Sequence, residues 1–216
     1  MEYILTAVAI FILIISVVIH EYAHGRVSYA FGDTTAKDEG RLTLNPIKHL
    51  DPVGSIFLPI FLVVLNTGFI IGWARPVPIN PDNYHNKRLG WIATAIAGPV
   101  SNYSLMLISM VLILLIGHNT EGAMWLFIFK VILWYILAIN FVLGSFNLIP
   151  LPPLDGFWIL LNLLPSSLRD KISSIVISKY YPLFIIITVV LALLISRYTI
   201  IPVMNAMEEW LKVFPR

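Results

Sequence analysis

Four long apolar segments run through the 216-residue sequence, and polar loops separate them. The segments are Tyr3–Phe31, Leu89–Ile116, Ala123–Ile149 and Tyr181–Ser196. A helix needs about 20 apolar residues to span the hydrocarbon core of a bilayer. We expect all four segments to span it, because the last one, which is short, can be extended by Tyr198–Ile201. Hydrophobic residues make up 58% of the chain and charged residues only 12%, which leaves too few polar side chains to cover a water-facing surface. We therefore predict an all-α polytopic membrane protein, integral to the bilayer.

The charge and cysteine content exclude several functions. A net charge of +2 is too small to indicate a nucleic-acid partner. The sequence contains no cysteine, so disulfides, cysteine-ligated metals and thiol catalysis are excluded.

The basic residues predict how the chain is oriented. Nine of the 14 lysines and arginines lie in three polar regions, namely Lys37, Arg41, Lys48, Arg75, Lys87, Arg88, Arg169, Lys171 and Lys179. The positive-inside rule places all three regions in the cytoplasm and the N-terminus outside, in a multi-pass protein of the cell membrane.

The stretch Pro52–Trp73 lies between two of these regions, so it must enter the membrane and return to the same side. Its interruptions at Gly54, Pro59 and Asn66–Gly68 suit such a re-entrant hairpin, and the alternative is a full crossing. The predicted fold thus has about four to six membrane segments, a re-entrant hairpin, and short strand-like elements on the cytoplasmic side at Arg41–Asn45 and Val77–Asn80. Each strand-like element is either an edge that receives an unwound substrate or a loop folded on itself.

The run His20–His24 is an HExxH motif inside the first apolar segment. Residues i and i+4 share a helix face, so both imidazoles can bind one metal ion, and Glu21 is placed to act on a metal-bound water. Ionisable residues inside a membrane helix cost about 2.5–3.5 kcal/mol each on insertion scales. Three of them within five residues therefore favour a metal site over a polar packing face.

A catalytic zinc needs a third protein ligand and one open position. Asp155 is the best candidate, because it follows a proline-rich turn after the third apolar segment and can return to the depth of the two histidines. The alternative is that Asp155 caps the short helix that follows it. Helix rise places His20–His24, the stretch Gly98–Asn102 and the turn before Asp155 in one layer, in the cytoplasmic half of the membrane.

Three motifs in order make the chain resemble the site-2 protease family of intramembrane zinc metalloproteases, in its minimal form without accessory domains. They are HExxH at His20–His24, GPxxN at Gly98–Asn102 and an NxxPxxxxDG-like element at Asn147–Gly156. The resemblance implies one zinc ion per chain, held by His20, His24 and Asp155.

The resemblance further implies that Glu21 is the general base, with Asn102 and Asn147 as catalytic polar supports near the substrate carbonyl or the zinc-bound water. The implied reaction is hydrolysis of peptide bonds in or near transmembrane segments of membrane protein substrates. We expect residues 1–216 to form one membrane-embedded metalloprotease domain, with a core at 3–165 and a C-terminal membrane helix and amphipathic tail at 166–216. The oligomeric state is not predicted.

Two other functions are weighed against this one. In a metal-ion transporter, His20, Glu21, His24 and Asp155 would line an ion path, but such a protein more often has repeated halves, and the sequence contains no visible repeat. A zinc protease with a distal glutamate ligand would need a later Glu at the right depth. The glutamates after residue 39, which are Glu121, Glu208 and Glu209, lie elsewhere.

Overall fold

A computed structural model describes residues 2–57, 60–61, 64, 74–117, 123–176 and 181–211. The longer helices are α1 (Glu2–Ala30), α4 (Lys87–Ile116), α5 (Met124–Asn147), α6 (Asp155–Leu163), α7 (Ser166–Val176), α8 (Tyr181–Ile195) and α9 (Ile201–Leu211). Shorter elements are α2 (Thr35–Asp38), the 3-10 turns η1 (Pro46–Lys48) and η3 (Pro81–Asn83), and the π-helical turns η2 (Pro52–Phe57) and η4 (Ser196–Ile200).

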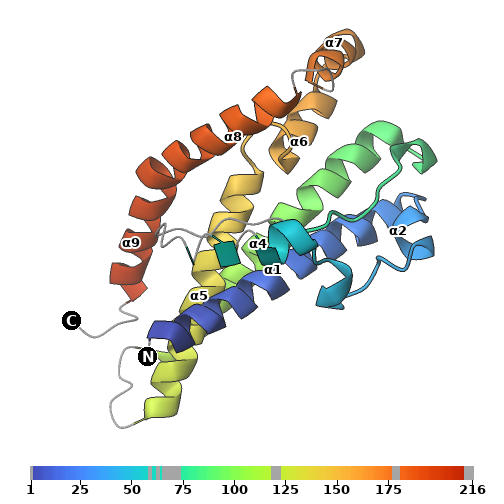
Figure 1. Cartoon of the computed structure of the whole chain (residues 1–216). Helices are drawn as coiled ribbons and strands as arrows, with labels where there is room; N and C mark the ends of the chain where they lie inside the picture. The colour runs from blue at the N-terminus through green and yellow to red at the C-terminus, as the bar shows by residue number, and fades with distance from the viewer. Residues whose placement is uncertain are drawn as a thin grey trace.

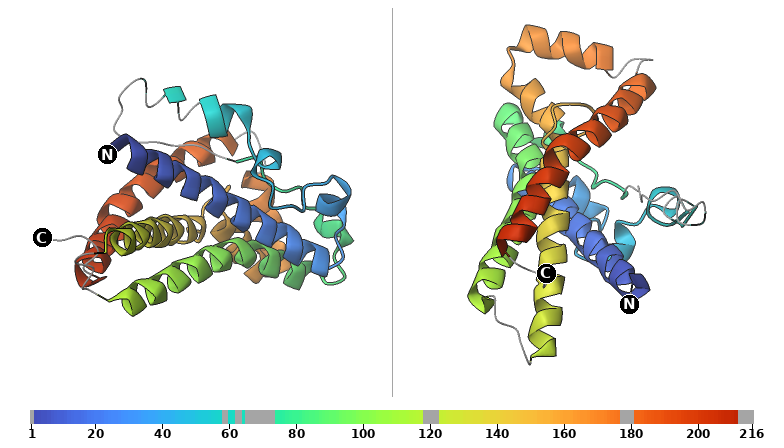
Figure 2. Two further views of the ribbon diagram at one scale, coloured as in Figure 1. Left: turned by 90° about the horizontal axis from the view of Figure 1, so that it is seen from below. Right: turned by 90° about the vertical axis from the view of Figure 1, so that its left-hand side faces the viewer.

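Helices α1, α4 and α5 pack against one another and form the centre of the protein (Figures 1 and 2). They contain 29, 30 and 24 residues, which corresponds to about 36–45 Å of helix at 1.5 Å per residue. Each of the three is long and apolar enough to cross a membrane. The structure therefore confirms three of the predicted membrane segments.

The outer faces of these helices are apolar. Phe11 on α1, Leu115 on α4 and Trp125 on α5 are 65%, 76% and 69% exposed, respectively. A soluble protein rarely leaves so many large apolar side chains in contact with water, whereas lipid accepts them. The interior instead holds polar side chains such as Ser16, Asn102 and Asn140, each at most 2% exposed. This distribution fits a helix bundle surrounded by hydrocarbon.

The C-terminal helices pack along one side of the central bundle (Figure 1). The predicted segment Tyr181–Ser196 forms α8, which has only 15 residues and is not confirmed as a full span. The predicted C-terminal amphipathic tail contains α9. Its apolar face packs on α4 and α5 in a buried cluster made of Ile113, Leu133, Trp134, Leu137, Ala138 and Leu211.

The described residues include no β-strand, so the predicted strand-like elements are not confirmed. Backbone groups in and beside these segments bond to nearby turns or to side chains. Arg41 donates from Nη2 to the carbonyls of Arg75 and Pro76, at 2.8 and 3.1 Å. The amide of Val77 donates to Glu21, and that of Asn80 donates to Asp33. Most of the hairpin predicted at Pro52–Trp73 lies outside the described residues, which include its first part as η2.

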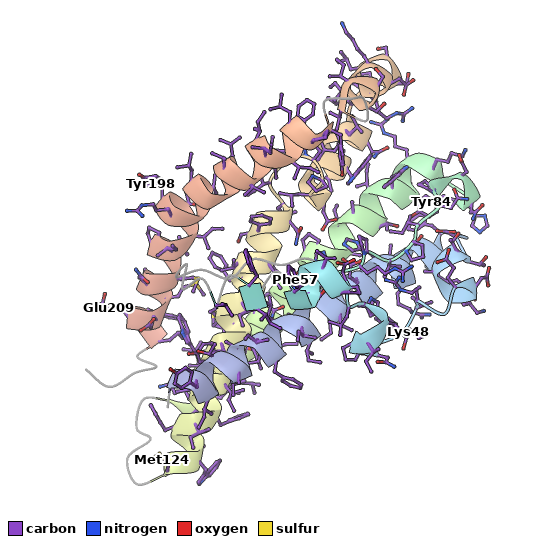
Figure 3. The ribbon with its side chains drawn as sticks, viewed as in Figure 1. Lys48, Phe57, Tyr84, Met124, Tyr198 and Glu209 are labelled. Atoms are coloured by element: carbon purple, nitrogen blue, oxygen red, sulfur yellow. The ribbon has the colours of Figure 1, made fainter. Side chains whose placement is uncertain are left out.

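The two ends of the bundle differ in polarity. Lys48 and Tyr84 lie at one end and Met124 at the other (Figure 3). The first end is formed by residues 32–51, 74–88 and 164–176, and we call it the basic end.

Candidate metal centre

His20 and His24 lie one turn apart on α1 and present their rings to the same point. Their Nε2 atoms are 3.0 Å apart, and the two side chains are buried, at 7% and 6% exposure. The helical spacing of i and i+4 produces this arrangement directly.

Asp155 completes the group from the opposite side. It is the first residue of α6, and its Oδ2 lies 3.2 Å from His20 Nε2 and 3.3 Å from His24 Nε2. Leu154, not Asp155, occupies the N-cap position of α6, and that cap makes no side-chain hydrogen bond. Among the described residues, these three form the one group of His, Asp and Glu side chains whose ligand atoms lie within 4.8 Å of one another.

Both histidine rings are oriented by hydrogen bonds on their far side. His20 Nδ1 lies 2.6 Å from Asn102 Oδ1, and His24 Nδ1 lies 2.6 Å from the carbonyl oxygen of Thr94. Both oxygens are acceptors. The Thr94 oxygen belongs to a backbone carbonyl, and the Asn102 side chain is oriented by its amide nitrogen, which donates to Asn140 Oδ1. Each ring therefore carries its proton on Nδ1 and directs the Nε2 lone pair toward Asp155, as in metal-binding histidines.

The facing atoms fit a zinc ion. Two Nε2 lone pairs and a carboxylate oxygen meet at 3.0–3.3 Å, and Asp155 Oδ2 is buried without a hydrogen-bond partner. Three acceptors this close repel one another unless a cation lies between them. In a tetrahedral zinc site with bonds of about 2.0–2.1 Å, neighbouring ligand atoms are about 3.3 Å apart. The residues present thus match zinc in both donor type and spacing.

Two glycines allow the helices to approach this closely. A Cβ at Gly98 of α4 would overlap the imidazoles of His20 and His24, at 2.5 Å from His20 Cε1. A Cβ at Gly156 would overlap the backbone carbonyl of Leu148, so glycine there lets α6 turn back tightly after α5. Glycine at these positions is required by space, and it sets the distance between α1, α4 and α6.

Glu21 follows His20 and faces the segment 74–80. Its Oε2 accepts a hydrogen bond of 2.8 Å from the Val77 amide. Arg41 donates to the carbonyls of Arg75 and Pro76, just before Val77, and the Arg75 amide donates to the carbonyl of His49. Sequence reasoning missed the contact between Glu21 and Val77, because a backbone donor leaves no signal in residue type.

The two predicted polar supports occupy different surroundings. Asn102 is fully buried behind His20, and its side chain is shared between His20 and Asn140. Asn140 in turn donates to Ser16 of α1, so one polar chain links the three central helices through Asn102. Asn147 is half-buried at the end of α5 and donates to the carbonyl of Leu143. The structure therefore brings Asn102 to the candidate metal centre, where it orients the His20 ring.

A second polar network lies just outside α1, at the basic end. Burial of Asp33 raises its pKa, but hydrogen bonds from Thr35, Asn80 and Asn83 outweigh burial and lower the pKa to about 2. Asp33 also accepts from Ser28 Oγ, and Ser28 lies 3.0 Å from Tyr84 Oη.

Tyr84 Oη is also 3.0 Å from Thr94 Oγ1, and Thr94 provides the carbonyl that orients His24. The loop ends at 32–35 and 80–84 are thereby tied to the metal centre.

Comparison with known proteins identifies the family. The profile of Peptidase family M50 matches residues 8–193. The chain belongs to this family. It is therefore a zinc metalloprotease embedded in the membrane, and the site-2 protease resemblance of its motifs is confirmed. This membership supports a hydrolase and not the metal-ion transporter.

Two relatives show how far the likeness extends. "Putative zinc metalloprotease YwhC" of Bacillus subtilis (strain 168) is 42% identical over 207 residues, which are 94% of this chain and 88% of that protein. "Putative zinc metalloprotease Rip2" of Mycolicibacterium smegmatis is 30% identical over 158 residues, which are 71% of this chain and 58% of that protein. No solved structure matches the chain significantly.

Proposed function

We propose that this M50 peptidase is an intramembrane endopeptidase that hydrolyses peptide bonds in or near transmembrane segments of membrane proteins. The observation that carries the proposal is the convergence of three lone pairs, from His20, His24 and Asp155, at tetrahedral zinc spacing within the helix bundle. We propose these three residues as the ligands of one zinc ion per chain. Zinc, when bound, supplies Lewis acidity that lowers the pKa of water and polarises a carbonyl.

Glu21 is the proposed general base. It is adjacent to His20 in sequence and only partly buried, so its carboxylate is within reach of both the proposed metal site and water. It takes the proton of the attacking water and returns it to the leaving nitrogen. The bond from the Val77 amide fixes one carboxylate oxygen, Oε2, and so sets the orientation of the whole group.

The two asparagines are assigned different roles. Asn102 keeps His20 in the tautomer that presents Nε2, because its Oδ1 accepts the proton on Nδ1. Asn147 lies at the end of α5 before the turn to Asp155, and its amide has a second N–H beyond the one directed to Leu143. We propose Asn147 as the donor that stabilises the oxyanion of the scissile carbonyl.

The proposed location follows from charge. The metal centre lies nearer the basic end than the N-terminus of α1, and basic ends face the cytoplasm. We propose a protein of the cell membrane with its active site in the cytoplasmic half. Residues 1–216 act as one domain, since the family match continues from the core past residue 165 to residue 193.

The decisive test replaces Glu21 by glutamine. Glu21→Gln keeps the size and hydrogen-bonding groups of the side chain but cannot accept a proton. We expect zinc content to stay at the wild-type level while cleavage of a co-expressed single-span substrate falls by at least ~10²-fold. The matched control is Glu39→Gln, an exposed loop position, which should cleave normally. Near wild-type cleavage by Glu21→Gln would refute the proposed base.

A further inference from the structure

A hollow of about 260 Å³ lies at the basic end between α4, α6 and α7, and none of the proposed metal ligands lines it. Each helix presents to it a pair of residues four positions apart, which share a helix face. The pairs are Lys87 and Trp91 on α4, Trp158 and Asn162 on α6, and Arg169 and Ser173 on α7, and Arg88 and Leu161 complete the lining.

The two tryptophans form one wall of the hollow. Trp91 and Trp158 stack with their ring centroids 5.1 Å apart and an angle of 11° between the planes. This pair joins α4 to α6 and provides a flat apolar surface beside the charged groups. Tryptophan favours the boundary between hydrocarbon and water, and Trp91 lies on the first turns of a helix that can cross the membrane. The hollow is therefore placed at the level of the lipid headgroups.

The rim of the hollow carries more positive than negative charges. Lys87 pairs with Asp82 at 2.6 Å, and Arg169 pairs with Asp170 at 3.2 Å. Arg88 instead donates to the carbonyls of Asn162 and Leu163, which are neutral, so its charge is not cancelled by those contacts. Exposed ion pairs such as Lys87–Asp82 are weak and exchange readily for a stronger anion. The N-terminus of α4 adds a partial positive charge at the same place.

We propose that this hollow binds a phosphate-bearing anion, and that the headgroup of an acidic phospholipid is its occupant in the membrane. Lys87, Arg88 and Arg169 would contact the phosphate, and the stacked tryptophans would cover the glycerol and the first acyl carbons. The Ser173 hydroxyl, which donates to the Asp170 carbonyl at 3.0 Å, would redirect its proton to the phosphate. Clusters of basic residues beside membrane helices recognise acidic lipids through this combination. The headgroup would then lie at one end of α6, whose other end carries Asp155.

The test compares two double variants that remove the same charge. Lys87→Gln/Arg169→Gln changes the hollow, whereas Lys48→Gln/Lys171→Gln changes exposed basic residues outside it. The full chain is purified in detergent, phosphatidylglycerol or phosphatidylcholine is titrated in, and bound lipid is counted by native mass spectrometry. Zinc content of each variant reports on intact folding. Glycerol 3-phosphate serves as a soluble probe of the same chemistry.

We expect the wild type and the control variant to bind one phosphatidylglycerol in preference to phosphatidylcholine. The hollow variant should bind phosphatidylglycerol about tenfold more weakly or worse. Glycerol 3-phosphate binding that depends on the same residues, without a preference for phosphatidylglycerol, would support the anion site and assign it to a soluble phosphate. Equal loss in both double variants, or equal binding in the hollow variant and the wild type, would overturn the proposal.

Discussion

The close packing of α4 on the metal centre makes Gly98→Ala a sharp test of the structure. The added Cβ would lie 2.6 Å from His20 Nε2 and nearer still to His24 Nε2, whereas ordinary contact begins at 3.4 Å. The rings or the helix must therefore move by at least about 0.8 Å. Metal–ligand distances tolerate only about ±0.2 Å, so the ligand set cannot keep its geometry. We expect zinc affinity to fall at least tenfold, which corresponds to about 1.4 kcal/mol.

The assay is the dissociation constant for zinc, measured on the purified chain against a competing chelator. Alanine is a better helix former than glycine, by up to about 1 kcal/mol, so loss of zinc should not be accompanied by loss of helix content. Gly144→Ala on α5 is the matched control, because its Cβ meets only the Tyr103 ring at 3.2 Å and should leave zinc bound. Wild-type zinc affinity in Gly98→Ala would show that α4 does not approach the histidines as described.

Three further predictions concern other parts of the bundle. Asn102→Ala removes the acceptor for His20 Nδ1 and should weaken zinc binding by about 10–100-fold, as measured by the same chelator competition; unchanged affinity would remove Asn102 from the site. The pKa of Asp33 is lowered, so its contribution of about 2 kcal/mol is present above pH 4 and is lost as the pH falls toward 2. Thermal unfolding of Asp33→Asn should lack this dependence, and an identical pH profile in both proteins would refute it. Tags at Asp82 and Ser167 should both be labelled from the cytoplasm, and labelling from opposite sides would exclude the re-entrant hairpin.

The helical parts of this protein are determined largely by its sequence. Long, predominantly apolar runs form α1, α4 and α5. A membrane helix satisfies its own backbone hydrogen bonds, so length and hydrophobicity are enough to predict it. The spacing of His20 and His24 likewise makes them neighbours, since a helix fixes the positions of residues i and i+4. Asn140 is a polar side chain among apolar ones on α5, so it bonds to polar partners on α4 and α1.

The tertiary structure alone decided which partners these residues meet. Asp155 reaches the histidines because Gly98 lets α4 approach α1 closely and Gly156 lets α6 turn back tightly after α5. Asn102 contacts His20 because the crossing of α1 and α4 directs its side chain behind the ring. The Thr94 carbonyl and the Val77 amide contact the site through the backbone, which is identical at every residue and so leaves no mark in the sequence. Local sequence patterns determine which side chains share a face of one helix. The distances between helices depend instead on contacts between residues far apart in the chain.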